Sequence, residues 1–231
     1  MNAFLVTFAG CMLGCYALCG VPFGLIIAQK MSGVDVRNTG SGNIGMTNVA
    51  RSAGGSAAAL TFLCDVGKGL LSMLLCRLIL AQVLPAGLSF DVAGEGFAAL
   101  TVLYVCCVFG HVFSPYLGLH GGKGISVGFG AALGLYWPLA LVLLACFVLF
   151  AVPTRYVSAG SVIAAALLPV QAYFLWHFSA WSCVPLLVVS AVVIWAHRSN
   201  IVKLAHGEER RFTVKKSSKE GEQAAAQEGK R

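Results

Sequence analysis

The residues best suited to chemistry lie in a glycine-rich segment, residues 40–51, within a chain that is otherwise almost continuously apolar. Glycines let a backbone turn sharply and can leave amide N–H groups bare for an anion. Side-chain donors accompany them, and Arg51 adds a planar cation that matches phosphate. A flexible loop would explain the glycines but not the donors, so we expect a phosphate or acidic-substrate site. The candidate residues are Ser41, Gly42, Asn43, Gly45, Thr47, Asn48 and Arg51.

Three further polar clusters follow later apolar stretches. The first is Gly-Gly-Lys-Gly at a predicted helix start, where bare amides and the helix dipole favour anions. Each cluster also has a structural interpretation: the serines could cap a helix, and the histidines could anchor a span or be buried structural residues. The candidates are His111, Gly121, Gly122, Lys123 and Gly124 in the first cluster, Ser158 and Ser161 in the second, and His197, Asn200 and Glu208 in the third.

Composition predicts an all-α, polytopic membrane protein, because apolar residues make up 58% of the chain and charged residues only 11%. The fourth apolar stretch could be one tilted span or two short ones broken at Trp137-Pro138. We expect two, and therefore seven spans. The amino-terminal stretch lacks a basic leader and is predicted to be a retained helix. The stretches are residues 3–28, 56–84, 96–110, 125–151, 158–175 and 181–196.

The distribution of Lys and Arg orients these spans. With seven spans and the amino terminus outside, the basic residues flanking the glycine-rich segments share the cytoplasmic side with the carboxyl terminus. The loops expected on the opposite side, near residues 85–95, 137 and 177–181, contain no Lys or Arg. The polar clusters thus all fall on the cytoplasmic face. The basic residues there are Lys30, Arg37, Arg51, Lys123 and Arg155.

The net charge of +7 needs no nucleic-acid partner, because basic residues near a membrane attract anionic lipid headgroups. Residues 1–212 are expected to form the membrane domain, and residues 213–231 a polar, basic, disordered tail. Cys11, Cys15 and Cys19 share a helical face, which favours a buried small-residue stripe over a metal site. Asp65 and Lys68 lie three apart within a span and are expected to pair or to face the bundle interior.

Four segments in this order resemble the bacterial acyl-phosphate:glycerol-3-phosphate acyltransferases, the PlsY family. They are Ser-Gly-Asn-Ile-Gly-Met-Thr-Asn-Val-Ala-Arg, Gly-Gly-Lys-Gly, Arg-Tyr-Val-Ser-Ala-Gly-Ser and His-Arg-Ser-Asn-Ile. The resemblance runs to about Phe212 and implies seven spans, a periplasmic amino terminus and an active site at the cytoplasmic face of the bacterial inner membrane. In one departure from the family pattern, Leu119 and His120 stand where phenylalanine and a lysine or arginine are usual, so a titratable side chain replaces a permanent cation.

The resemblance implies transfer of a fatty acyl group from acyl phosphate to the 1-hydroxyl of sn-glycerol 3-phosphate, giving lysophosphatidic acid and phosphate. It implies no metal or cofactor and no CoA or acyl-carrier protein. It assigns catalytic roles to Ser41, Arg51, Lys123, Ser161, His197 and Asn200, with phosphate binding or support from the other candidates and His120. His111, His197 or a substrate phosphate could accept the hydroxyl proton, with the phosphate favoured.

Two other functions compete with this one. A small transporter of phosphorylated metabolites would use the same anion site, but it should carry donor groups on both membrane faces or further charges at mid-bilayer. An alcohol phosphatidyltransferase would need several metal-binding aspartates on one helix pair. The chain's aspartates are Asp35, Asp65 and Asp91, which are too widely separated for that enzyme.

Overall fold

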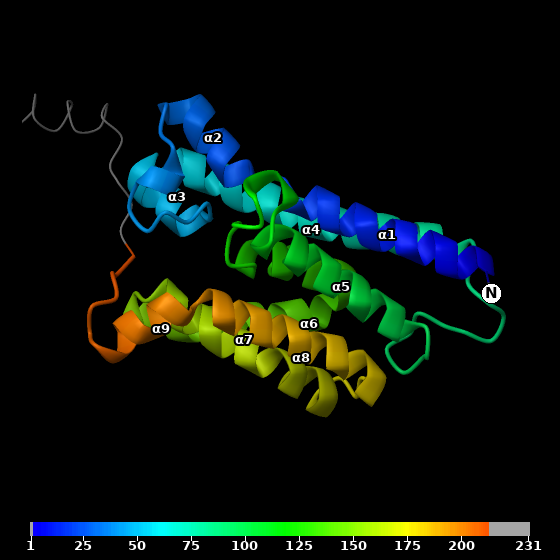
Figure 1. Cartoon of the computed structure of the whole chain (residues 1–231). Coiled ribbons are helices and arrows are strands. Elements are labelled where there is room, and N and C mark those ends of the chain that lie inside the picture. The colour runs from blue at the N-terminus through cyan, green and yellow to red at the C-terminus, as the bar shows by residue number, and fades with distance from the viewer. Residues whose placement is uncertain (1, 213–231) are drawn as a thin grey trace, which may run out of the picture. The chain divides into compact units, whose positions relative to one another are not determined.

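The structure is a computed structural model that describes residues 2–212, and within that range every regular element is helical (Figure 1). The expected tail, residues 213–231, lies outside the described residues. The α-helices are α1 (Asn2–Gly20), α2 (Phe23–Ser32), α3 (Met46–Ser52), α4 (Gly55–Ala81), α5 (Phe97–Val112), α6 (Ile125–Thr154), α7 (Val157–Phe174), α8 (Ala180–Ala196) and α9 (Arg198–Ala205), and the 3₁₀ turns are η1 (Val36–Asn38) and η2 (Pro115–Leu117).

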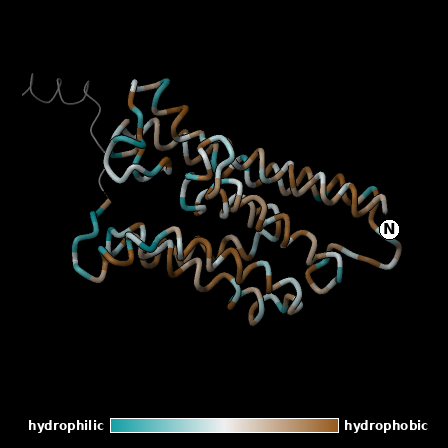
Figure 2. The backbone as a smooth tube through the Cα atoms, viewed as in Figure 1, coloured by the Kyte–Doolittle hydropathy of each residue, from teal (hydrophilic) through white to brown (hydrophobic). Residues whose placement is uncertain are grey.

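Most of these helices are long and apolar enough to cross a membrane. There are 5 such segments, or 6 if the bent pair α8 and α9, with 58° between them, counts as one span. Figure 2 shows the apolar residues along the long helices and the polar ones gathered in the loops and in α9. The all-helical, multi-pass architecture expected from the sequence is therefore present, with fewer separate candidate spans than the expected seven. The segments are Ala3–Ser32, Gly55–Ala81, Phe97–Leu117, Ile125–Thr154 and Val157–Phe174.

Two helix breaks explain the difference from the expected boundaries. Pro22 has no N–H to donate, and the first apolar stretch divides there into α1 and α2. Within α6, Tyr136 has extended backbone angles (φ −160°, ψ 101°), two residues before Pro138. The Tyr136 ring packs against Trp176 and Phe178, with centroids 5.3 and 5.8 Å away. The expected break at Trp137-Pro138 is thus a kink one residue earlier, inside one continuous element.

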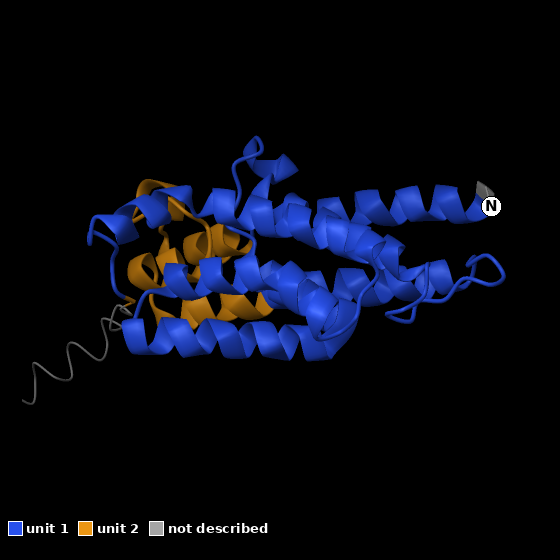
Figure 3. Cartoon of the chain, turned by 90° about the horizontal axis from the view of Figure 1, so that it is seen from below, with its two compact units in different colours: residues 1–22, 65–211 blue, residues 23–64, 212–231 orange. Residues whose placement is uncertain are grey.

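The chain divides into two compact units (Figure 3). The larger unit comprises Met1–Pro22 and Asp65–Arg211, and the smaller one comprises Phe23–Cys64 together with Phe212–Arg231. Helix α4 therefore begins in the smaller unit and continues in the larger one. Each unit carries some of the polar clusters singled out in the sequence, and each is described by itself below.

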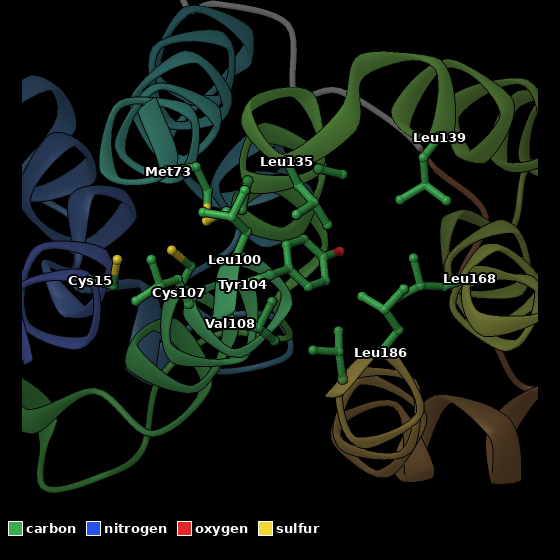
Figure 4. Close-up of a cluster of buried hydrophobic side chains, with 14 of the residues drawn as sticks. Cys15, Met73, Leu100, Tyr104, Cys107, Val108, Leu135, Leu139, Leu168 and Leu186 are labelled. Carbon is green, nitrogen blue, oxygen red and sulfur yellow. The ribbon is translucent and has the colours of Figure 1, made fainter. Parts of the chain in front are cut away.

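Helix α5 lies at the centre of the larger unit, where it packs against α1, α6 and α8, while α7 packs against α6 and α8. Its buried side chains meet those of neighbouring helices in one apolar core (Figure 4). Cys15 of α1 and Cys107 of α5 approach each other there, near Met73 of α4. Because lipid tails are as apolar as leucine, this packing holds through close fit rather than through a hydrophobic difference.

Helices α4 and α6 cross at a set of glycines. A Cβ on Gly69 would overlap the Val127 carbonyl oxygen, and one on Gly130 would overlap that of Val66. The four-residue spacing of Gly130 and Gly134 therefore does mark a close helix approach, as such spacings do in membranes. The same spacing at Gly10 and Gly14 does not, because nothing described lies within 4 Å of a Cβ at either position.

The cysteines of α1 are buried against α4 and α5. Cys15 Sγ lies 3.5 Å from Cys76 Sγ, and Cys19 Sγ lies 3.4 Å from Ser72 Oγ. Among the residues that the structure describes, no group of three or more His, Cys, Asp or Glu side chains has the arrangement of a metal site. The three thiols act as small packing side chains, which is the interpretation that the sequence favoured.

Candidate functional site

Asn48 organises the glycine-rich segment of the smaller unit. Its Nδ2 lies 2.9 to 3.0 Å from the carbonyl oxygens of Val36, Thr39 and Asn43, and its Oδ1 accepts a hydrogen bond from Ser41 N at 2.9 Å. The side chain is 2% exposed. Gly40 has φ +60°, and a Cβ at this position would overlap Asn48 Oδ1, so the turn requires a glycine here. Asn48, expected to contact phosphate, therefore uses its amide to shape the loop.

Several backbone amides of this segment already donate hydrogen bonds within the smaller unit. Gly42 N donates to the Thr39 carbonyl at 2.9 Å, and Gly45 N donates to Asn43 Oδ1 at the same distance. These two glycine amides are among those that the sequence was expected to leave bare, and Ser41 N is used as well. That expectation is wrong for them, because the tight turns that glycine permits are closed by their own hydrogen bonds.

Thr47 and Arg51 are two of the candidate side chains expected to contact phosphate. They lie four residues apart on α3 and so share one face of the helix, and both are partly exposed. Arg37, the nearby alternative cation, is held by Asp35 in an ion pair of 2.6 Å. Hydrogen bonds from Arg37 lower the pKa of the Asp35 carboxyl below its ordinary value. Thr39 Oγ1 donates to Ser52 Oγ at 2.9 Å, which ties the two ends of the segment together.

A chain of polar contacts in the larger unit joins residues from three separate segments. Lys123 Nζ donates to Asn200 Oδ1, and Asn200 Nδ2 donates to Glu209 Oε1 at 2.7 Å. Ser158 Oγ donates to the same glutamate oxygen at 2.8 Å. The start of α6, the start of α7 and helix α9 are thereby fixed to one another. We call this set, Lys123, Asn200, Glu209 and Ser158, the lysine–glutamate network.

Glu209 is the member that the sequence did not single out. The expected residue was Glu208, whose side chain is exposed and whose amide N–H donates to the Lys203 carbonyl at 2.8 Å. Gly207 has φ +71° and turns the chain after α9. Of the two adjacent glutamates, the second therefore points back to Ser158 and Asn200. The sequence signal available was the glycine before the pair, but spacing alone does not say which carboxylate turns inward.

Two other candidates from these clusters are buried and bonded to their own helices. Ser161 Oγ donates to the Val157 carbonyl at 2.8 Å, a back-bond within α7. His197, 3% exposed, has Nδ1 2.8 Å from the Val193 carbonyl oxygen. Because a carbonyl only accepts, Nδ1 carries the hydrogen and the neutral ring presents a lone pair at Nε2. Each of these hydrogen bonds is internal to the side chain's own helix or its end.

The Gly-Gly-Lys-Gly segment folds back onto the end of α5. Gly121 N donates to the Val112 carbonyl at 2.9 Å, and Gly122 N donates to that of His111 at 3.0 Å. These two amides are therefore not bare, contrary to expectation. Gly124 has φ +85° and caps the start of α6. His120, in the preceding turn, is exposed, and its Nδ1 lies 2.6 Å from the Gly118 carbonyl oxygen.

Known proteins match this chain over nearly its whole length. A family described as glycerol-3-phosphate acyltransferase matches residues 9–207. The glycerol-3-phosphate acyltransferase of Bartonella henselae is 35% identical over 204 residues, covering 88% of this chain and 91% of that protein. The enzyme of Parasynechococcus marenigrum is 40% identical over 198 residues, covering 84% of each.

Solved structures agree with the sequence matches. The crystal structure of PlsY, an integral membrane glycerol 3-phosphate acyltransferase in its glycerol 3-phosphate form, superposes with a TM-score of 0.76 at 30% identity, covering 89% of this chain and 96% of that one. The lysophosphatidic acid form gives 0.74 at 28% identity. These matches decide for an enzyme over a transporter. The chain belongs to the PlsY-type glycerol-3-phosphate acyltransferase family.

Proposed function

We propose that this acyltransferase uses acyl phosphate as its donor and acylates the 1-hydroxyl of glycerol 3-phosphate, giving lysophosphatidic acid and phosphate. The observation that carries the proposal is the lysine–glutamate network, in which Lys123 is held by Asn200, and Asn200 in turn is held by Glu209. A cation fixed in place can stabilise a phosphate leaving group without reorganising during the reaction. A mixed anhydride of this kind is already activated, so no covalent nucleophile is needed.

The reaction is then a direct transfer. The glycerol hydroxyl oxygen attacks the acyl carbonyl carbon, the bond from that carbon to the phosphate oxygen breaks, and the hydroxyl proton moves to a base. His197 has the tautomer that a base requires, with a lone pair at Nε2. His111 has the opposite tautomer, because its Nδ1 faces the Lys68 ammonium at 3.0 Å. The proton acceptor is accordingly His197 or the leaving phosphate. The phosphate is favoured, because it is a good leaving group that needs little assistance from a protein side chain.

The residues of the smaller unit supply side-chain contacts to phosphate in this proposal. Arg51 offers a bidentate cation, and Thr47, on the same face of α3, offers a hydroxyl. Ser41 and Asn43 come from the exposed and half-buried parts of the loop that Asn48 shapes. Gly42, Gly45, Gly121 and Gly122 act through backbone shape. Glu209 takes the supporting role that the sequence assigned to Glu208.

We also propose the finer topology: seven spans, a periplasmic amino terminus and a cytoplasmic carboxyl terminus in the bacterial inner membrane. The kink at Tyr136 would divide α6 into two spans. Residues 125–135 are mostly buried among other helices, so a short first half need not meet lipid. Arg77 departs from the charge pattern, since it lies near the opposite end of α4 and donates to the Phe90 carbonyl at 3.4 Å.

The remaining proposals concern the extent of the enzyme and its partners. Residues 1–212 form the acyltransferase domain, and residues 213–231 a basic cytoplasmic tail that contacts anionic lipid. The acyl chain of the donor lies among the membrane helices, while both phosphates stay at the interface. Neither CoA nor acyl-carrier protein takes part.

Donor identity is tested with the full chain purified in detergent. Palmitoyl phosphate and glycerol 3-phosphate should together give stoichiometric phosphate and lysophosphatidic acid, measured by phosphate release and by mass spectrometry. Palmitoyl-CoA in place of palmitoyl phosphate should give no product above the rate without enzyme. EDTA should leave the rate unchanged. Robust turnover with palmitoyl-CoA, or a loss of rate in EDTA that magnesium restores, would contradict the proposed donor chemistry.

A further inference from the structure

Three ionisable side chains that are not members of the lysine–glutamate network meet in the interior of the larger unit. Asp65 and Lys68 lie on adjacent turns of α4, and His111 lies near the end of α5. The exposed fractions of the three residues are 2%, 4% and 4%. Burying charges inside a membrane bundle is costly, and they are tolerated where each has a partner. We call this set the buried triad.

Lys68 is the centre of the triad. Its Nζ lies 2.8 Å from Asp65 Oδ1, 2.8 Å from the Val21 carbonyl oxygen and 3.0 Å from His111 Nδ1. An ammonium group can only donate, so it requires a lone pair on His111 Nδ1. The neutral imidazole must then carry its hydrogen on Nε2. Asp65, whose Oδ1 is 3.8 Å from His111 Nδ1, supplies the opposite charge that pairs with the Lys68 ammonium in the interior.

The other edge of the His111 ring supports the Gly-Gly-Lys-Gly segment. A Cβ on Gly122 would overlap His111 Nε2, so the ring lies directly against that residue. The His111 carbonyl oxygen accepts a hydrogen bond from Gly122 N at 3.0 Å. Both the ring and the backbone of His111 therefore touch the residue that immediately precedes Lys123.

We propose that Lys68, neutralised by Asp65, is a positioning residue for the acyl transfer: through His111 it fixes the ring edge on which Gly122 rests, and thereby the place of Lys123. The inference rests on the proposed function in one respect, the role of Lys123 at the phosphate. In this arrangement His111 presents an N–H at Nε2 toward the glycine segment, and its other nitrogen is occupied by Lys68. The triad thus sets both the location and the tautomer of the ring.

The tautomer of His111 can be measured directly in the unmodified enzyme. Nitrogen-15 NMR of histidine-labelled protein in detergent should show His111, assigned by the signal missing in His111→Gln, with its hydrogen on Nε2. A ring with its hydrogen on Nδ1, or with both nitrogens protonated, would overturn the proposal. This readout does not depend on turnover, so it separates the triad from the choice of acyl donor.

A double variant, Asp65→Asn with Lys68→Met, removes both charges together and leaves no unpaired ion. We expect kcat to fall about 10- to 100-fold, as small displacements at a reacting centre do, with a smaller change in KM for glycerol 3-phosphate. The His111 signal should shift toward a mixture of tautomers. The control is Gln171→Leu, which removes another buried polar group, from α7, and should keep kcat within about twofold. Unchanged kcat and tautomer in the double variant would reject the proposal.

A pair of His111 variants carries the test if the double variant does not fold. Glutamine places its amide nitrogen near the position of Nε2, whereas asparagine reaches only the position of Nδ1. If the ring acts by supporting Gly122, His111→Gln should retain at least about tenfold more kcat than His111→Asn. Equal rates, or a faster His111→Asn, would mean that His111 serves only as a partner for Lys68, and the positioning role would be wrong. If the wild-type enzyme proves inactive with palmitoyl phosphate, the donor proposal fails and these ratios are measured with whichever acyl donor is active.

Discussion

Asn48 and Glu209 each hold several polar groups together, Asn48 within one loop and Glu209 between separate helices. Asn48 gathers three carbonyl oxygens and one amide of the glycine-rich segment, and Glu209 accepts hydrogen bonds from Ser158 and Asn200. Both act by holding other groups in place. Hydrogen bonds to a carboxylate are stronger than neutral ones, and losing one partner leaves the others unsatisfied. A single substitution of Asn48 or Glu209 should therefore lower activity more than the number of hydrogen bonds it removes would suggest.

Arg51 is the cation of the smaller unit on which the phosphate proposal depends. Losing a bidentate phosphate contact should cost about 2–4 kcal/mol of transition-state stabilisation, or roughly a hundredfold in rate or more. Arg51→Lys should be severely impaired and Arg51→Ala nearly inactive. Arg37→Lys is the matched control, because Arg37 is exposed and paired with Asp35, and it should keep most of its activity. Phosphate release by monodisperse preparations is the measurement; an active Arg51→Ala enzyme would refute the proposed anion site.

The adjacent glutamates offer a test of the lysine–glutamate network. Glu209→Gln keeps the shape of the side chain and removes its charge, which should weaken two charge-assisted hydrogen bonds and lower kcat/KM by about tenfold or more. Glu208→Gln changes an exposed side chain and should lower it less than about threefold. The two variants differ by one position and have the same composition. A loss of equal size at both would mean that the network of Glu209 does not order Lys123.

At the scale of elements, the close contact between α4 and α6 depends on glycines. Gly69 and Gly130 each lie where a Cβ would strike the backbone of the facing helix. This close approach carries Lys68 on α4 next to the segment that opens α6. The same helix offers a contrast at Gly67, where nothing described lies within 4 Å of a Cβ.

Substituting these two glycines should separate packing from helix propensity. Gly69→Ala overpacks the crossing and should lower the free energy of unfolding by about 1–3 kcal/mol. Gly67→Ala should leave it unchanged or raise it by up to about 1 kcal/mol, since alanine favours a helix more than glycine does. Thermal unfolding of the detergent-solubilised variants, followed by intrinsic fluorescence, provides the comparison. If the Gly69→Ala variant proved as stable as the Gly67→Ala variant, the stability of the protein would not depend on the close approach of α4 and α6.

For the whole molecule, the distribution of charge decides the orientation in the membrane. Single cysteines in a cysteine-free background should reveal it through an impermeant thiol reagent applied to intact cells. Ala86→Cys, in the exposed loop after α4, should be labelled from outside. Asn38→Cys and Ser199→Cys, both at exposed positions, should be labelled only after the membrane is permeabilised. Labelling of Asn38→Cys in intact cells would place the glycine-rich segment on the wrong side for cytosolic glycerol 3-phosphate.

The sequence by itself determined the class of the protein, the family and the ends of most long helices to within a few residues, but not the break between α1 and α2 or the short helices α3 and α9. Long apolar stretches have one stable form in lipid, because every backbone group must bond within the segment. The four polar segments follow one another in the order of the family's motifs, and their residue types suit phosphate binding. The kink in α6 was also predictable to within one residue, since Pro138 has no N–H to donate to the hydrogen-bond ladder of the helix.

Only the tertiary structure decided which donors are already used. The amides of Gly42, Gly45, Gly121 and Gly122 looked available in the sequence, but all four donate hydrogen bonds to other groups of the chain. Likewise, the choice between Glu208 and Glu209 depends on the turn at Gly207, and the tautomers of His111 and His197 depend on Lys68 and the Val193 carbonyl. Sequence patterns list the groups that can donate or accept. Which partner each group meets is set by backbone direction and by neighbours from distant segments, and those exist only in the folded chain.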